Sequence, residues 1–141
     1  AYRLGVFGVM ALGDERVLPA NIAVHDVLEG ARFIRKEIHN FGGDKYQISL
    51  MGHSTGATIA LVLAFSPATN GDDEAPLFAR TIAMSASGFL MKEEDRSHRV
   101  VGKLGCKGTA QEIVDCLLPL STDDIVKVAE VEKGEFLEQL M

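Results

Sequence analysis

The apolar and polar residues along the chain alternate between short apolar runs and one long amphipathic stretch. In residues 2–10 glycines interrupt the apolar positions, which predicts a strand end that leads into a loop. From residue 21 to 38 the apolar positions recur every three or four residues, which predicts an amphipathic helix with Asn21 as its N-cap. A left-handed glycine after Asn40 is expected to end it. The apolar positions of this helix are Val24, Val27, Leu28, Ala31, Ile34 and Ile38.

Further apolar runs lie on both sides of a Gly-x-Ser-x-Gly pentapeptide. Residues 46–51 have the length of a buried strand, and the continuous apolar run at residues 57–65 predicts a helix. Residues 81–85 predict a second buried strand. The order strand, helix, strand, helix, strand predicts an α/β fold with a parallel sheet.

Beyond residue 91 we expect short amphipathic helices. The charged segment at residues 92–99 is interpreted as a solvated helix face. Ser121 and Asp124 resemble a capping box with Asp in place of the usual Glu, which predicts a helix start there.

The pentapeptide consists of Gly52, His53, Ser54, Thr55 and Gly56. A strand before it and a helix after it are the context of a nucleophile elbow, in which the serine hydroxyl is exposed at the tip of a sharp turn. The turn is so tight that a side chain at either glycine is expected to collide with the neighbouring strand or helix. The alternative is a Gly-Ser turn that joins strand to helix without any chemistry.

Composition and charge narrow the function classes. The chain has 141 residues, enough for one domain, and 47% of them are hydrophobic. It contains no apolar run of about 18 residues, so no membrane span is expected. The net charge of −6 opposes binding to nucleic acid or to an anionic membrane. Neither C-x-x-C nor a paired histidine spacing occurs, so no metal and no cofactor are expected.

Two cysteines, Cys106 and Cys116, flank an expected loop and helix start. A bond between them would close a small loop and contribute about 2.5–3 kcal/mol in the chain-entropy model, and it would indicate an oxidising compartment. Two unpaired thiols in a cytosolic protein are equally compatible with the cysteine count.

Taken together, these residues resemble the type B carboxylesterases, which include the cholinesterases. The matching positions run in the same order along nearly the whole chain: residues 2–8, 19–21, 26, 41–44, the pentapeptide, 66–67, 77–78, 80, 82–83, 85, 104–106 and 115–117. The resemblance implies a partial α/β-hydrolase fold with Ser54 as nucleophile and the Thr55 backbone N–H as oxyanion-hole donor. It also implies a Cys106–Cys116 disulfide and a protein that is secreted, membrane-anchored or in the lumen of the endoplasmic reticulum.

Several positions depart from the family pattern. Members usually carry Glu at His53 and Ala at Thr55, and they usually have Gly at Ala20, Trp at Phe33 and Gly at Ala86. The loss of a carboxylate at position 53 makes a preference for choline esters less expected than a generic ester preference. Thr55 is expected to be harmless, because the oxyanion hole uses its backbone N–H.

The base and acid of a catalytic triad are not found in this sequence. His98 is the one histidine after Ser54, and it follows too soon to match the family order of serine, acid and histidine, so we interpret it as a surface residue. His25 and His39 precede the serine and are interpreted as structural or exposed. The family's glycine-rich oxyanion loop is also absent, and its strand would fall between the strand near Leu4 and the Ser54 strand.

We therefore interpret residues 1–141 as the central part of one carboxylesterase α/β-hydrolase domain, truncated at both ends. The predicted function is hydrolysis of small carboxylic esters through an acyl-enzyme on Ser54, with the chain alone inactive because an unassisted serine is a weak nucleophile. One alternative is a catalytically inactive relative that serves as an adhesion or binding module. Another is a truncated chain with no function of its own.

Overall fold

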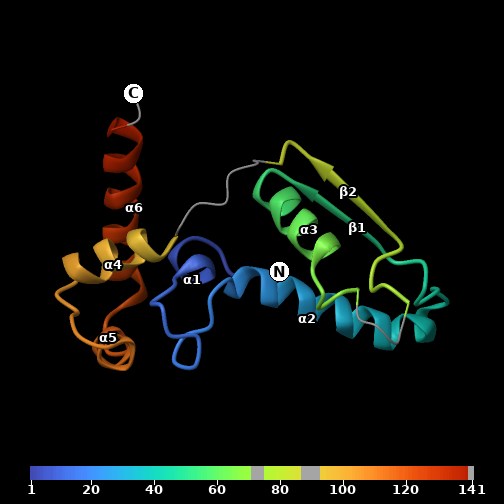
Figure 1. Ribbon diagram of the computed structural model, residues 1–141, viewed down its shortest axis with the longest axis horizontal. Coiled ribbons are helices and arrows are strands. Elements are labelled where there is room, and N and C mark those ends of the chain that lie inside the picture. Colours follow the sequence, from blue (N-terminus) through green and yellow to red (C-terminus); the bar gives the residue numbers. More distant parts are fainter. Residues whose placement is uncertain (71–74, 87–92, 140–141) are drawn as a thin grey trace. The chain divides into compact units, whose positions relative to one another are not determined.

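The computed structural model describes residues 1–70, 75–86 and 93–139. Figure 1 shows α1 (Val6–Val9), α2 (Ile22–Glu37), the 3-10 helix η1 (Ile38–Phe41), β1 (Ser49–His53), α3 (Thr55–Phe65), β2 (Arg80–Met84), α4 (Glu93–Lys103), α5 (Ala110–Leu117) and α6 (Thr122–Gln139). They fall into two compact units. The sheet unit comprises residues 1–2 and 24–90, and the helical unit comprises residues 3–23 and 91–141.

In the sheet unit, β1 and β2 are neighbouring parallel strands joined by α3, which confirms the predicted parallel α/β arrangement (Figure 1). The register pairs Ser49 with Arg80 and His53 with Met84. A parallel pair needs a crossover connection, which the apolar helix α3 supplies. Both strands and α3 lie within two or three residues of the predicted ranges.

The expectation that both strands are buried is wrong for this chain. Met51 is 65% exposed, Ile82 49% and Met84 43%. The register places these three residues on one face of the two-stranded sheet, since paired residues of parallel strands share a face. The buried residues of α3 are Ala57, Ile59, Ala60 and Leu63. Within the described residues, α3 packs against the sheet while the face with Met51 stays uncovered, which explains the exposure.

The predicted strand in residues 2–10 is also wrong. Residues 6–9 form the short helix α1, and Gly5 precedes it with a left-handed φ of 55°. The Gly8 and Val9 N–H groups both donate to the Gly5 carbonyl. A strand must pair its backbone groups with a neighbour. Because none of the described residues pairs with this segment as a strand, local turn bonds satisfy its backbone instead.

The amphipathic helix is confirmed as α2, which begins directly after Asn21. It continues into η1 and ends at Gly42, whose φ of 78° is the expected left-handed conformation. Leu28 and Ala31 are buried, whereas Ile34 is exposed.

The helical unit is held by a core that includes a disulfide. Cys106 and Cys116 are bonded, with Cα atoms 5.7 Å apart, and Cys106 is only 2% exposed. Around Cys106 the core contains Met10, Leu12, Val101 and Ile113. Cys106 and Cys116 therefore form the disulfide, and the alternative of two unpaired thiols is wrong.

An ion-pair cluster joins α4 to α6. Glu132 is 4% exposed, and its carboxylate accepts hydrogen bonds from Lys103 Nζ at 2.7 Å and Arg99 Nε at 3.0 Å. These bonds, that of Lys103 first, hold the pKa of Glu132 below its ordinary value against the opposing effect of burial. Lys92 lies outside the described residues. The interpretation of residues 92–99 as a solvated face is wrong at Ser97, which is buried and accepts the Ala11 N–H at 3.0 Å, whereas Arg99 is exposed although it pairs with Glu132.

Caps define the starts of the last two helices. The Asp124 N–H donates to Ser121 Oγ at 3.2 Å directly at the start of α6, as predicted. The Asp124 carboxylate accepts from the Ser121 hydroxyl. A complete capping box, which sequence analysis did not identify, begins α5 at Thr109 and Glu112.

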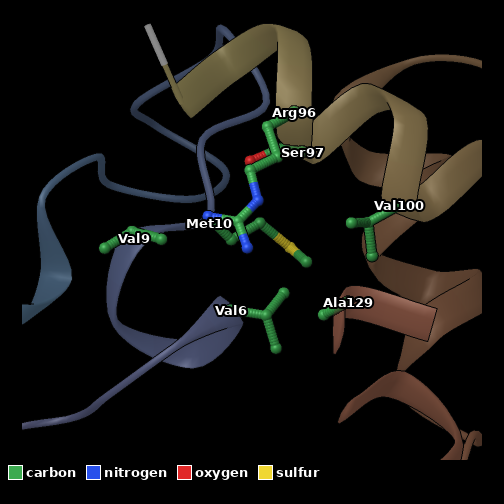
Figure 2. A pocket seen from close by; sticks show the side chains of 7 residues that line it. All are labelled: Val6, Val9, Met10, Arg96, Ser97, Val100 and Ala129. Atoms are coloured by element: carbon green, nitrogen blue, oxygen red, sulfur yellow. The ribbon is translucent and has the colours of Figure 1, made fainter. Parts of the chain in front are cut away.

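The cavity between α1, α4 and α6 is too small for a substrate. Figure 2 shows Met10 pointing into it beside Val6, Val100 and Ala129. Its volume of about 10 Å³ leaves room for one water molecule at most. This part of the helical unit is therefore packed core.

Candidate functional site

Ser54 stands at the junction of β1 and α3, with β1 ending at His53 and α3 beginning at Thr55. Its backbone has φ 54° and ψ −123°, a conformation that non-glycine residues rarely adopt. Such strained residues persist only where the surrounding structure holds them, and they concentrate at functional sites. The side chain is exposed, so a reactant could reach the hydroxyl.

The backbone around Ser54 is fixed on both sides. The Ser54 N–H donates to the Met84 carbonyl at 2.9 Å, which extends the pairing of β1 with β2 by one residue. The Ser54 carbonyl accepts from the N–H groups of Ala57 at 2.9 Å and Thr58 at 3.1 Å. Sheet and helix thus hold the residue between them.

The Ser54 hydroxyl does not cap α3, although Ser54 occupies the N-cap position. Serine is among the best N-cap residues because its oxygen accepts a backbone N–H of the first turn. Here Ser54 has an unusual backbone conformation, and its side chain makes no capping hydrogen bond to α3. The hydroxyl is therefore available for chemistry rather than used for helix stability.

The two glycines of the pentapeptide differ. A Cβ at Gly52 would lie 2.1 Å from the Gly56 carbonyl oxygen and 2.6 Å from the Ala57 nitrogen, and backbone atoms cannot move away easily. The expected collision is confirmed for Gly52. A Cβ at Gly56 would meet only Tyr2 Oη among the described residues, at an ordinary contact distance of 3.7 Å. The expected collision is therefore not found at Gly56.

Thr55 begins α3, so its backbone N–H has no acceptor within the helix. Its side chain is exposed. Backbone N–H groups at a helix start favour negative charge, because the helix dipole adds to their own partial charge. This N–H could donate to an oxygen on a group attacked by Ser54.

Ser85 is a site residue that sequence analysis missed. It follows β2 directly and has a left-handed φ of 53°. Since His53 pairs with Met84, the next residues Ser54 and Ser85 follow neighbouring strands at the same edge of the sheet. Position 85 is among those that match the family pattern, but a serine without a glycine or a turn motif beside it does not predict a left-handed backbone.

The histidine that directly precedes Ser54 in the chain is His53. His53 is exposed at the end of β1. His25 on α2, His39 in η1 and His98 on α4 are all exposed, as predicted. Their exposure agrees with the interpretation of His98 as a surface residue and of His25 and His39 as structural or exposed.

A parallel strand–helix–strand unit with an exposed serine between strand and helix is characteristic of α/β-hydrolases. Comparison with known proteins identifies the class more closely. The family model described as the carboxylesterase family matches residues 1–140. The chain belongs to this family, and its fold is part of the α/β-hydrolase fold.

Individual relatives are esterases. Acetylcholinesterase of Danio rerio is 33% identical over 124 residues, which cover 82% of this chain and 19% of that protein. Carboxylesterase 3B of Mus musculus is 31% identical over 136 residues, 92% of this chain and 23% of that protein. Juvenile hormone esterase of Heliothis virescens is 38% identical over 88 residues, 62% of this chain and 14% of that protein. The chain thus spans about a fifth of the length of its first curated relatives.

Among the described helices, none combines the length and the apolar composition that a membrane crossing requires.

Proposed function

We propose that this chain carries the nucleophile of a serine carboxylesterase and that Ser54 is that nucleophile. The observation that supports this most directly is the conformation of Ser54: exposed, strained at φ 54° and not used as a helix cap. The turn is a nucleophile elbow in this proposal, with Gly52 as the position that must lack a side chain.

In the proposed reaction, Ser54 Oγ attacks the ester carbonyl carbon while a general base takes the hydroxyl proton. The Thr55 N–H donates to the carbonyl oxygen as negative charge develops on it. The carbon–oxygen bond of the ester then breaks, the alcohol leaves with the proton from the base, and an acyl group remains on Ser54. Water hydrolyses this acyl-enzyme by the same steps and releases the carboxylic acid.

The base and its orienting acid are assigned to parts of the esterase that this chain does not include. The acetylcholinesterase and carboxylesterase 3B relatives are about four to five times as long as the segment that matches this chain. Their length leaves room for both residues. A serine hydroxyl without a base is a weak nucleophile at neutral pH. The 141 residues alone are therefore expected to be inactive.

A fluorophosphonate probe tests the assignment, because it labels activated serines in preference to merely exposed ones. The full-length protein and the 141-residue chain are labelled side by side, and adducts are mapped by mass spectrometry. We expect an adduct on Ser54 in the full-length protein alone. A folded full-length protein that stays unlabelled would instead favour a non-catalytic binding module.

For the substrate, we propose uncharged carboxylic esters. His53, directly before Ser54, is exposed where the resembling esterases usually carry a carboxylate. A carboxylate would attract a cationic alcohol group, and the imidazole does not supply that charge. The test compares acetylcholine with its neutral analogue 3,3-dimethylbutyl acetate. His53→Glu should raise kcat/KM for the cationic ester relative to the neutral one, whereas an unchanged ratio would contradict the proposal.

The Cys106–Cys116 disulfide supports a secreted, membrane-anchored or luminal location, because cytosolic thiols are kept reduced. Location can be tested by following the full-length protein, expressed with its natural N-terminus, in a secretory cell line. Recovery only from the cytosol would contradict the proposal.

A further inference from the structure

A basic depression lies at the end of the sheet unit that is opposite to Ser54. Its volume is about 670 Å³. Its basic and aromatic lining side chains are Arg32, Arg35, Lys36, His39, Lys45 and Tyr46, and the carboxylate of Asp44 lines it as well. They come from the last turns of α2, from η1 and from the loop that leads to β1. Lys45 and Tyr46 precede β1 whereas Ser54 follows it, so the length of the strand, about 17 Å, separates the depression from the proposed nucleophile.

The cations are gathered around one aromatic ring. Arg35 lies 5.4 Å from the centre of the Tyr46 ring, and Lys45 Nζ lies 4.9 Å from it. Arg35 also donates to the Pro76 carbonyl at 2.8 Å, which ties a third segment to the site. The Asp44 carboxylate accepts the Tyr46 N–H at 2.8 Å and so fixes the loop that carries the ring. Arg35 and Tyr46 therefore have defined positions, and Lys45 extends from the same fixed loop.

Stabilisation of α2 explains the presence of only some of these basic residues. Arg35 and Lys36 in the last turn of α2 favour the helix dipole, as basic residues at a helix end usually do. Arg32 forms a pair with Glu29 at 2.6 Å, and Lys36 lies 3.7 Å from Glu37. Lys45 belongs to a different segment and does not complement the dipole of α2. Two cations held at one ring repel each other, and an anion bound near both would relieve that repulsion.

We propose that this depression is a binding site for the sulfate groups of an acidic polysaccharide. Arginine and lysine are the side chains that bind such oxyanions, and the Tyr46 ring holds two of them close together. Sulfated polysaccharides are preferred over nucleic acid because the Cys106–Cys116 disulfide indicates an oxidising, extracellular-type compartment. Because the whole chain has a net charge of −6, attraction of a polyanion must come from a local cluster of cations such as this one.

The test measures binding of a heparin dodecasaccharide to the full-length protein at about 0.15 M ionic strength, where longer-range attraction is screened. The double variant Lys36→Gln/Lys45→Gln removes two charges from the depression. Its matched control, Lys107→Gln/Lys127→Gln, removes two charges from exposed lysines of the helical unit. We expect the dissociation constant to rise about tenfold in the first variant, because two exposed charge contacts are lost. In the control variant it should change less than about twofold.

Three results would overturn the proposal: absence of binding, equal loss in both variants, or equal binding of a desulfated dodecasaccharide. A polyphosphate of equal charge that binds in place of heparin and depends on Lys36 and Lys45 would also overturn the assignment to sulfated sugar. Hydrolysis of a small ester should be unchanged in the Lys36→Gln/Lys45→Gln variant. This last measurement separates the site from the proposed esterase function, because neither lysine belongs to it.

Discussion

In the sheet unit, Met51, Ile82 and Met84 are exposed, and Ser54 and Ser85 both have left-handed backbone conformations. In the helical unit, by contrast, a disulfide lies in the core and the buried carboxylate of Glu132 has two cationic partners. In the first region two serines have a positive φ, whereas among the described residues of the second the one non-glycine residue with a positive φ is Asn21, a residue type that tolerates it. Strain of this kind must be compensated by the surrounding fold.

The difference separates two kinds of residue in this chain. Residues near Ser54 are expected to alter chemistry when they are changed, or to disturb a turn that has no room for adjustment. Residues of the helical unit are expected to alter stability by amounts that follow from the lost contacts. Four variants, ordered by expected effect, test whether substitutions in the two regions have these different consequences.

Ser54→Ala gives the largest expected effect. In the full-length esterase it should lower kcat by about 10⁴-fold or more, because the acyl-enzyme cannot form. The melting temperature should not fall. Thr55→Ala is the control: it keeps the backbone N–H and should change kcat only a few-fold. Ester hydrolysis that survives Ser54→Ala would remove Ser54 from the mechanism.

Gly52→Ala tests the turn itself. The new Cβ would lie 2.1 Å from the Gly56 carbonyl oxygen, so we expect a loss of about 3–5 kcal/mol in the free energy of unfolding. Gly56→Ala is the matched control inside α3. Its Cβ has space, and alanine favours a helix over glycine by about 1 kcal/mol, so stability should stay equal or rise. The free energy of unfolding of both variants is measured by urea unfolding. Equal stability of Gly52→Ala and Gly56→Ala would show that the turn is not tight at Gly52.

The local pattern of the sequence predicted the elements that are determined by local interactions. The helix at residues 21–38, its glycine end at Gly42 and the strand–serine–helix order around Ser54 were all predicted. The periodicity of apolar residues and the conformational freedom of glycine suffice for these features. The family was also recognised before the structure, from the matching positions along the chain.

The features that were predicted wrongly or missed depend on contacts between residues that are distant in sequence. The apolar run at residues 2–10 resembles a strand, but a strand forms only where another strand pairs with it. Met51 is exposed because burial requires a second layer of helices, which no single segment encodes. The Arg99–Glu132 pair joins residues 33 apart in the chain, and helix periodicity alone gives no signal for it.

Removal of the disulfide tests the helical unit. In the chain-entropy model a cross-link between residues ten apart contributes about 2.5–3 kcal/mol, so Cys106→Ala/Cys116→Ala should lose at least this much in the free energy of unfolding. Wild-type protein unfolded with and without a reducing agent isolates the cross-link from the packing of the buried Cys106 sulfur. Activity of the folded fraction should be retained. A loss of activity without a loss of stability would contradict the division between the two units.

Glu132→Gln is expected to have the smallest effect, about 1–2 kcal/mol at pH 7, because Arg99 and Lys103 are half-exposed and keep access to water. Glu130→Gln, on an exposed position of the same helix, is the control and should stay within about 0.5 kcal/mol of wild type.

The pH dependence of this effect follows from the lowered pKa of Glu132. The folded protein binds this proton less readily than the unfolded chain does, so the carboxylate stabilises the fold above its unfolded pKa, near the ordinary value of 4.5. This contribution is lost as the pH falls through the lower pKa of the folded state. The stability gap between wild type and Glu132→Gln, measured by urea unfolding, should therefore be constant from pH 7 to about pH 5 and narrow below that range. A gap that widens on acidification would mean that the carboxylate destabilises the packing of α4 against α6.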